Sequence, residues 1–193
     1  MIYLIDDKKL RQSKDFGWTN EKFIQFKDFI QPIYELTELE ERSQEVFQNG
    51  NVILYHESFL DNTNLKAQAS FKREKLDNFI KKTDKSRLVF FSGSKAVRNI
   101  DDRVASLPVS VFYENLETYI DQHKHGNSDL IFLLYGRNPY IEMELTQKLN
   151  QAIFNIDKQP AELNGCNNLF ITTDEKFIDN AIVNATEKID LYY

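Results

Sequence analysis

Cysteine is almost absent from this chain, because Cys166 is the only one among 193 residues. A single cysteine excludes an internal disulfide and fits a reducing compartment. With only three histidines beside it, the chain also offers no His/Cys spacing typical of a zinc site. Glycine is scarce as well, at six residues, and neither a dinucleotide-binding glycine pattern nor a Walker loop occurs. The common nucleotide-dependent activities are therefore not expected.

Long apolar runs and an excess of positive charge are also missing. The longest apolar run covers residues 130–135, far short of the roughly 20 residues needed to cross a bilayer. The N-terminus lacks the basic and apolar segments of a signal peptide. The net charge of −6 argues against general binding to nucleic acids or anionic membranes. We expect a soluble, cytoplasmic protein that binds neither nucleic acid nor membrane.

Apolar and aromatic residues are abundant, at 41% and 13% of the chain, which is typical of a globular protein. Short apolar runs alternate with longer helical patterns, and this alternation predicts an α/β fold with a doubly wound, mainly parallel sheet. The predicted strands cover residues 2–5, 33–36, 52–55, 88–91, 109–112, 130–135 and 169–172. The predicted helices cover about 20–30, 40–48, 65–82, 94–103, 115–120, 140–154 and 174–189.

A linker-like stretch, His125-Gly126-Asn127, divides this pattern. We predict an α/β domain over residues 1–125. For residues 126–193 we predict a C-terminal α/β extension, which could be continuous with the same sheet.

Polar residues follow the predicted strands. Asp6-Asp7 comes after the first strand, His56-Glu57 after the third, Ser92-Gly93-Ser94 after the fourth and Tyr113-Glu114 after the fifth. Because the carboxyl ends of parallel strands meet at one edge of a sheet, these side chains are expected to converge there. The predicted site consists of Asp6, Asp7, His56, Glu57, Ser92 and Glu114.

The first five strand–helix units resemble the receiver domain of two-component response regulators, over residues 1–122. The resemblance rests on Ile2-Tyr3-Leu4-Ile5-Asp6-Asp7, on Leu88-Val89-Phe90-Phe91-Ser92-Gly93, and on the 22 residues from Ser92 to Glu114. It implies a flavodoxin-like fold in which an acidic pair holds Mg²⁺, an aspartate after the third strand accepts a phosphoryl group, and a lysine follows the fifth strand. Here the acceptor position falls on His56 or Glu57, and the lysine position on Tyr113 or Glu114.

Since neither His56 nor Glu57 replaces an acceptor aspartate, the resemblance implies a pseudo-receiver. This is a non-enzymatic, phosphorylation-independent regulatory or protein-interaction module. Glu57 would then supply a fixed negative charge. Phe112 and Tyr113 lie near the face through which receivers couple to partners, so they are the expected interaction face for a protein partner or for self-association. No cofactor is expected, unless Asp6 and Asp7 retain the magnesium site.

A second hypothesis is a Mg²⁺-dependent phosphatase or phosphotransferase resembling the haloacid dehalogenase family. In that family an aspartate follows the first strand and a Ser/Thr-Gly pair follows a later one. It is the weaker hypothesis, because its chemistry uses two aspartates separated by one residue, whereas Asp6 and Asp7 are adjacent. The site residues also have structural interpretations: the acidic pair solvates the sheet edge, Ser92 caps a helix, and His56 is a buried, hydrogen-bonded histidine.

Overall fold

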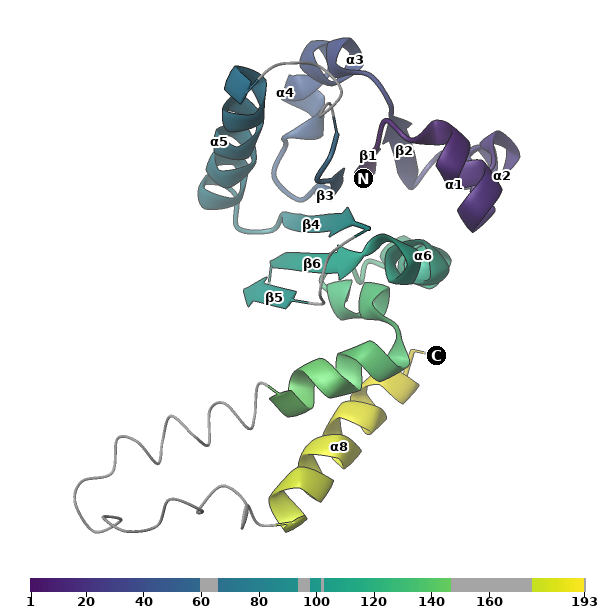
Figure 1. The fold of residues 1–193 in the computed structure, drawn as a ribbon, viewed down its shortest axis with the longest axis vertical. Helices are drawn as coiled ribbons and strands as arrows, with labels where there is room; N and C mark the ends of the chain where they lie inside the picture. The colour runs from purple at the N-terminus through teal and green to yellow at the C-terminus, as the bar shows by residue number, and fades with distance from the viewer. Residues whose placement is uncertain (60–65, 94–97, 102, 147–174, 193) are drawn as a thin grey trace, which may run out of the picture. The chain divides into compact units, whose positions relative to one another are not determined.

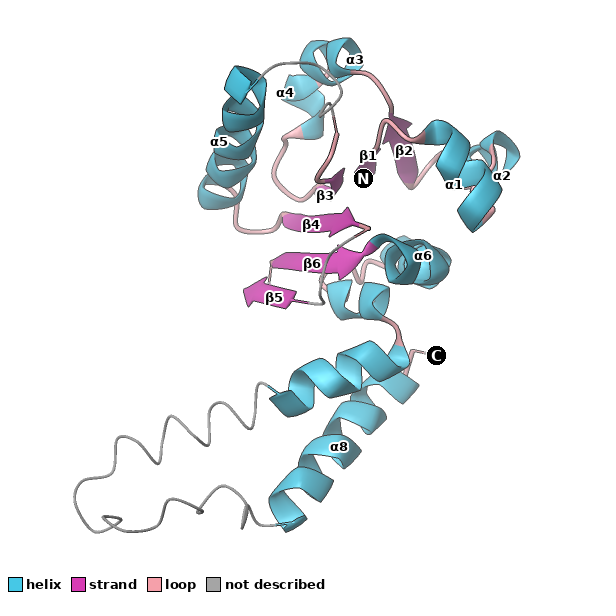
Figure 2. Ribbon diagram, viewed as in Figure 1, coloured by secondary structure: helices cyan, strands magenta, loops and turns pink. Residues whose placement is uncertain are grey.

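The computed structural model describes residues 1–59, 66–93, 98–101, 103–146 and 175–192. The chain divides into two compact units, Met1–Leu134 and Tyr135–Tyr193. In chain order the elements are β1 (Ile2–Ile5), α1 (Lys9–Phe16), α2 (Asn20–Gln25), β2 (Ile30–Ile33), α3 (Leu36–Glu41), α4 (Ser43–Val46), β3 (Val52–His56), α5 (Lys66–Lys82), β4 (Arg87–Ser92), β5 (Arg98–Asp101), β6 (Val104–Pro108), α6 (Val109–Lys124), the 3-10 helix η1 (Ile131–Tyr135) and α8 (Glu175–Asp190) (Figure 2). Residues 137–146 are also helical.

A six-stranded sheet in the order β2-β1-β3-β4-β6-β5 forms the centre of the first unit. Five neighbouring strands are parallel to one another, namely β2, β1, β3, β4 and β6. The sixth strand, β5, pairs with β6 in the antiparallel direction at one edge. The five parallel strands have the flavodoxin-like order. Figure 1 shows α3, α4 and α5 on one face of the sheet and α1 and α6 on the other. The predicted doubly wound α/β fold is therefore confirmed.

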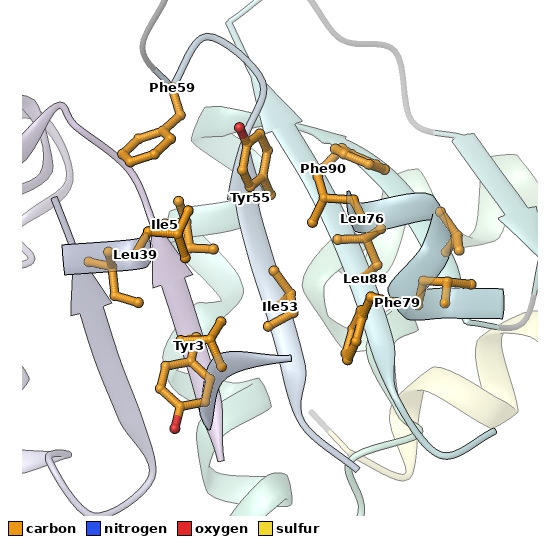
Figure 3. Close-up of a cluster of buried hydrophobic side chains, with 14 residues drawn as sticks. Tyr3, Ile5, Leu39, Ile53, Tyr55, Phe59, Leu76, Phe79, Leu88 and Phe90 are labelled. Atoms are coloured by element: carbon orange, nitrogen blue, oxygen red, sulfur yellow. The ribbon is translucent and has the colours of Figure 1, made fainter. Parts of the chain in front are cut away.

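The inner strands are mainly apolar because both of their faces are covered. All residues of β1 and β3 are buried. On one face, alternate residues of these strands pack against α3, α4 and α5; Figure 3 shows Tyr3 and Ile5 of β1 beside Ile53 and Tyr55 of β3. Burial of each such side chain contributes about 1.5–3 kcal/mol. This shared core fixes β1 and β3 as neighbours, and their carboxyl ends carry the polar residues of the predicted site.

The predicted fifth strand, residues 109–112, is wrong. These residues form the first turn of α6, and the strand is β6, directly before them. The β-branched Val109 and Val111 favoured a strand, but the buried positions of α6 recur at helical spacing, at Phe112, Leu116 and Tyr119. The helix predicted over 115–120 lies inside the longer α6.

Three further elements differ from their predictions. The helix predicted over 94–103 contains β5, and the strand predicted over 130–135 is the 3-10 helix η1, so the described part of the C-terminal extension is helical. The second strand is Ile30–Ile33 instead of 33–36, and Pro32 lies within it rather than ending a helix. Proline is tolerated there because β2 is an edge strand.

Several predicted elements are confirmed. The first, third and fourth strands, helix α5 and helix α8 lie within one or two residues of their predicted bounds. Thr19 caps α2, because its side-chain oxygen accepts a hydrogen bond from the Lys22 amide at 3.4 Å. The strand predicted over 169–172 lies outside the described residues. No helix in the described ranges combines the length and the apolar character that a membrane span requires.

Candidate functional site

The polar residues at the ends of β1 and β3 lie side by side. Ile5 is paired with Tyr55 in the sheet, so the next residues, Asp6 and His56, are neighbours at the carboxyl edge. The gap between β1 and β3 is the point where the strand order reverses, which is where α/β sheets of this order bind ligands. The His56 Nδ1 atom lies 3.7 Å from Asp6 Oδ1, and both side chains are buried, with exposed fractions of 2% and 0%.

Both carboxylate oxygens of Asp6 accept hydrogen bonds from within the chain. The Tyr113 hydroxyl donates to Oδ2 at 2.7 Å, and the Lys8 amide donates to Oδ1 at 2.9 Å. A carboxylate buried in a low-dielectric interior needs such donors, because an uncompensated charge there is costly. Asp6 is therefore built into the fold rather than presented to solvent.

Helix α1 brings an arginine to this carboxylate. The bond from the Lys8 amide to the Asp6 side chain closes a turn of the Asx type, which directs the chain from β1 into α1. Gly17 ends the helix in the left-handed conformation, with φ +70°. Arg11, on the first turns of α1, consequently has its Nη2 atom 3.6 Å from Asp6 Oδ2.

Arg11 also fixes the protonation state of His56. Its Nη2 atom lies 3.0 Å from His56 Nε2, and a guanidinium group carries donors only, so Nε2 must accept this bond with its lone pair. The ring proton is then on Nδ1, which lies 3.0 Å from the Ser58 hydroxyl oxygen. Burial lowers the pKa of His56 below its usual value, against the opposing effect of Asp6. The histidine is therefore neutral at physiological pH, with its one acceptor nitrogen engaged.

Tyr113 is held in place from two sides. Its ring stacks on Phe16 of α1, with centroids 4.7 Å apart, and packs edge-on against Phe91 of β4. Its backbone carbonyl accepts a buried hydrogen bond from the Trp18 indole at 3.2 Å. Burial, followed by the charge of Asp6, raises the pKa of the phenol well above its usual value. The hydroxyl thus remains a proton donor to Asp6.

Asp7, the second residue of the acidic pair, forms an ion pair with a lysine. Asp7 Oδ2 lies 2.7 Å from Lys8 Nζ. Among the described residues, the other oxygen, Oδ1, is buried without a hydrogen-bond partner. We refer to the whole group as the strand-edge cluster, which consists of Asp6, Asp7, Lys8, Arg11, His56, Ser58 and Tyr113.

Three side chains of the strand-edge cluster are of types that coordinate metal ions. One ligand atom each from Asp6, Asp7 and His56 lies within 4.8 Å of the others. A magnesium ion does not fit them as they stand, because it requires free oxygen ligands in octahedral geometry. Both oxygens of Asp6 already accept hydrogen bonds, and Lys8 and Arg11 place two positive charges against the same carboxylates.

The other predicted site residues are Glu57, Ser92 and Glu114. Glu57 follows β3 and is partly buried, and its backbone amide donates to the Phe91 carbonyl at 3.0 Å. Ser92 is the last residue of β4, opposite Pro108 in the sheet, and no helix within the described residues begins directly after it. Glu114 is exposed on α6, one residue after Tyr113.

The predicted interaction face is not at the surface. Phe112 is fully buried and stacks on Phe91 of β4, with ring centroids 4.1 Å apart, and Tyr113 is 2% exposed. The error follows from assigning residues 109–112 to a strand. In α6, Phe112 and Tyr113 are buried residues of the helix.

Arg11 and Ser58 were not predicted as site residues. The sequence carries one signal for Arg11: Gly17 has the residue type and position of a helix C-terminus, which indicates a helix between Asp7 and Gly17. That helix has a single fully buried residue, Gln12, and therefore no stripe of buried apolar residues.

No family model matches the chain, and no match was found among curated proteins or solved structures.

Proposed function

We propose that this protein is a cytoplasmic, non-enzymatic and phosphorylation-independent module that acts by binding a protein, either a partner or a second copy of the chain. The observation that carries the proposal is the hydrogen bond from Tyr113 to the fully buried Asp6, at 2.7 Å. In a receiver the corresponding carboxylate belongs to the acidic pair that holds Mg²⁺. Here the chain's own hydroxyl, from α6, takes that place.

The chemistry of the neighbouring residues supports the same proposal. Forming an acyl phosphate requires a carboxylate nucleophile, a divalent cation and a positive charge on the transferred oxygens. By the resemblance, the acceptor position falls on His56 or Glu57, and neither is an aspartate. His56 is not available as a nitrogen nucleophile either, since its Nε2 lone pair accepts from Arg11 and the ring is 2% exposed.

Labelling with a small acyl-phosphate donor in the presence of Mg²⁺ tests the proposal. We expect intact-mass spectrometry to detect no phosphoryl adduct on the full chain under conditions that label an authentic receiver. The Arg11→Ala variant, which frees His56 Nε2, is measured in parallel. An adduct mapped to His56 or Glu57 of the wild-type chain would contradict the proposal.

One observation favours the phosphatase or phosphotransferase hypothesis, namely the approach of Asp6, Asp7 and His56 to within 4.8 Å. We place it second, because the hydrogen bonds to Asp6 leave it poorly placed as a nucleophile. The assay is Mg²⁺-dependent release of phosphate from a generic ester. If the second hypothesis holds, Asp6→Asn abolishes the release, while Glu114→Gln, a change at an exposed acid on α6, leaves it unchanged.

A further inference from the structure

The carboxylates of the strand-edge cluster need a positive charge near them, whatever the protein binds. Asp6 is fully buried and Asp7 is only 17% exposed, so water compensates neither fully. Two basic side chains lie against them: Lys8 at 2.7 Å from Asp7, and Arg11 at 3.6 Å from Asp6. The formal charges of these four groups cancel.

Of the two bases, Arg11 holds the position that a bound cation would need. Its Nη2 atom contacts both Asp6 Oδ2, at 3.6 Å, and His56 Nε2, at 3.0 Å. An imidazole nitrogen and a carboxylate oxygen are also the atom types that bind a metal ion. Lys8, in contrast, pairs with the residue directly before it in the chain and leaves His56 untouched.

We propose that the Arg11 guanidinium substitutes for a metal ion at this sheet edge, and that the edge is a latent metal site that Arg11 keeps closed. Removing Arg11 releases the lone pair of His56 Nε2 and takes one positive charge away from Asp6. Asp6 keeps its hydrogen bonds from Tyr113 and the Lys8 amide, but each of its oxygens has a second lone pair, and one ligand atom each of Asp6, Asp7 and His56 lies within 4.8 Å of the others. This mixed nitrogen and oxygen set suits a first-row transition metal better than Mg²⁺.

The proposal is tested by titrating the full chain with Mn²⁺ and following the electron paramagnetic resonance signal of the free ion. We expect Arg11→Ala to bind Mn²⁺ with an affinity at least about tenfold higher than that of the wild-type chain, which is at the lower end of the effect of altering groups around metal ligands. Adding His56→Gln to Arg11→Ala should remove the new binding.

Two control variants separate the role of Arg11 from charge alone. Lys14→Ala removes the same charge from an exposed position on α1, and Arg11→Lys keeps the charge at the site. Both should resemble the wild-type chain. Binding by the wild-type chain equal to that of Arg11→Ala would overturn the proposal, as would a folded Arg11→Ala that binds no Mn²⁺.

Arg11→Met covers the case in which Arg11→Ala does not fold, because it keeps the apolar stem of the side chain without the charge. If both variants fold only when Mn²⁺ is present, the ion replaces the arginine, as proposed. If neither folds with or without Mn²⁺, a metal cannot take over the role of Arg11, and the proposal is wrong. None of these results depends on the proposed function, which is contradicted by phosphoryl labelling and not by metal binding.

Discussion

Replacing Tyr113 with phenylalanine removes one buried hydroxyl and leaves the ring packing in place. The hydroxyl donates at 2.7 Å to Asp6, whose other direct donor is the Lys8 amide, while Arg11 stays 3.6 Å away. A hydrogen bond to a charged group contributes about 1.5–3 kcal/mol. We therefore expect the free energy of unfolding to fall by about 2 kcal/mol, and Tm by about 4–8 °C for a chain of this size.

The measurement is urea denaturation followed by circular dichroism, with Tyr119→Phe as a matched control. Tyr119 lies on the same helix, is equally buried, and donates at 2.8 Å to the neutral carbonyl of Ser128. Its loss should cost about 1 kcal/mol. In an Asp6→Asn background, the cost of Tyr113→Phe should fall toward that value, and the cost of Tyr119→Phe should stay unchanged.

Equal costs for the two phenylalanine variants in the wild-type background would refute this reasoning. So would a double-mutant cycle showing no coupling between Tyr113 and Asp6. Either result would mean that the carboxylate draws its stability from other groups, and the main support for the proposed function would be lost.

Two further predictions concern residues outside the strand-edge cluster. Burial lowers the pKa of His123 from its usual value of 6.5 to about 4. As pH falls, this histidine is therefore protonated in the unfolded chain before it is protonated in the folded chain. Stability should therefore decline as pH drops from 6.5 toward 4, and a urea-denaturation series on His123→Gln should show a shallower decline. Phe112→Ala should cost about 3–5 kcal/mol of unfolding free energy by the same method, since a core residue loses far more on truncation than an exposed interaction residue.

The strands that the sequence predicts well are those covered on both faces. β1, β3 and β4 are continuous apolar runs, so their composition alone identifies them. β6 has the sequence Val-Ala-Ser-Leu-Pro, in which Ala105 and Ser106 are buried but weakly apolar. The more strongly apolar residues directly after it, 109–112, belong to α6. The predicted strand was therefore placed on the start of α6 instead of on β6.

The same distinction applies to the site. The proximity of Asp6 and His56 follows from the ends of two adjacent parallel strands, so it can be predicted once those strands are recognised. The contacts of Arg11 and Tyr113 depend on how α1 and α6 pack against the sheet and against each other. Such packing is set by tertiary contacts, through Phe16 and Trp18, which no local pattern encodes.

Pro32 in β2 has a consequence for how this protein can meet a partner. The Asp6 amide bonds to the Ile33 carbonyl and the Ile2 amide to the Phe29 carbonyl, so in a parallel ladder the intervening Pro32 faces the open side of β2. Because Pro32 has no backbone N–H, a further strand that paired with β2 would find no hydrogen-bond donor at the middle of this four-residue edge. This edge is therefore poorly suited both to strand-addition recognition and to edge-to-edge aggregation.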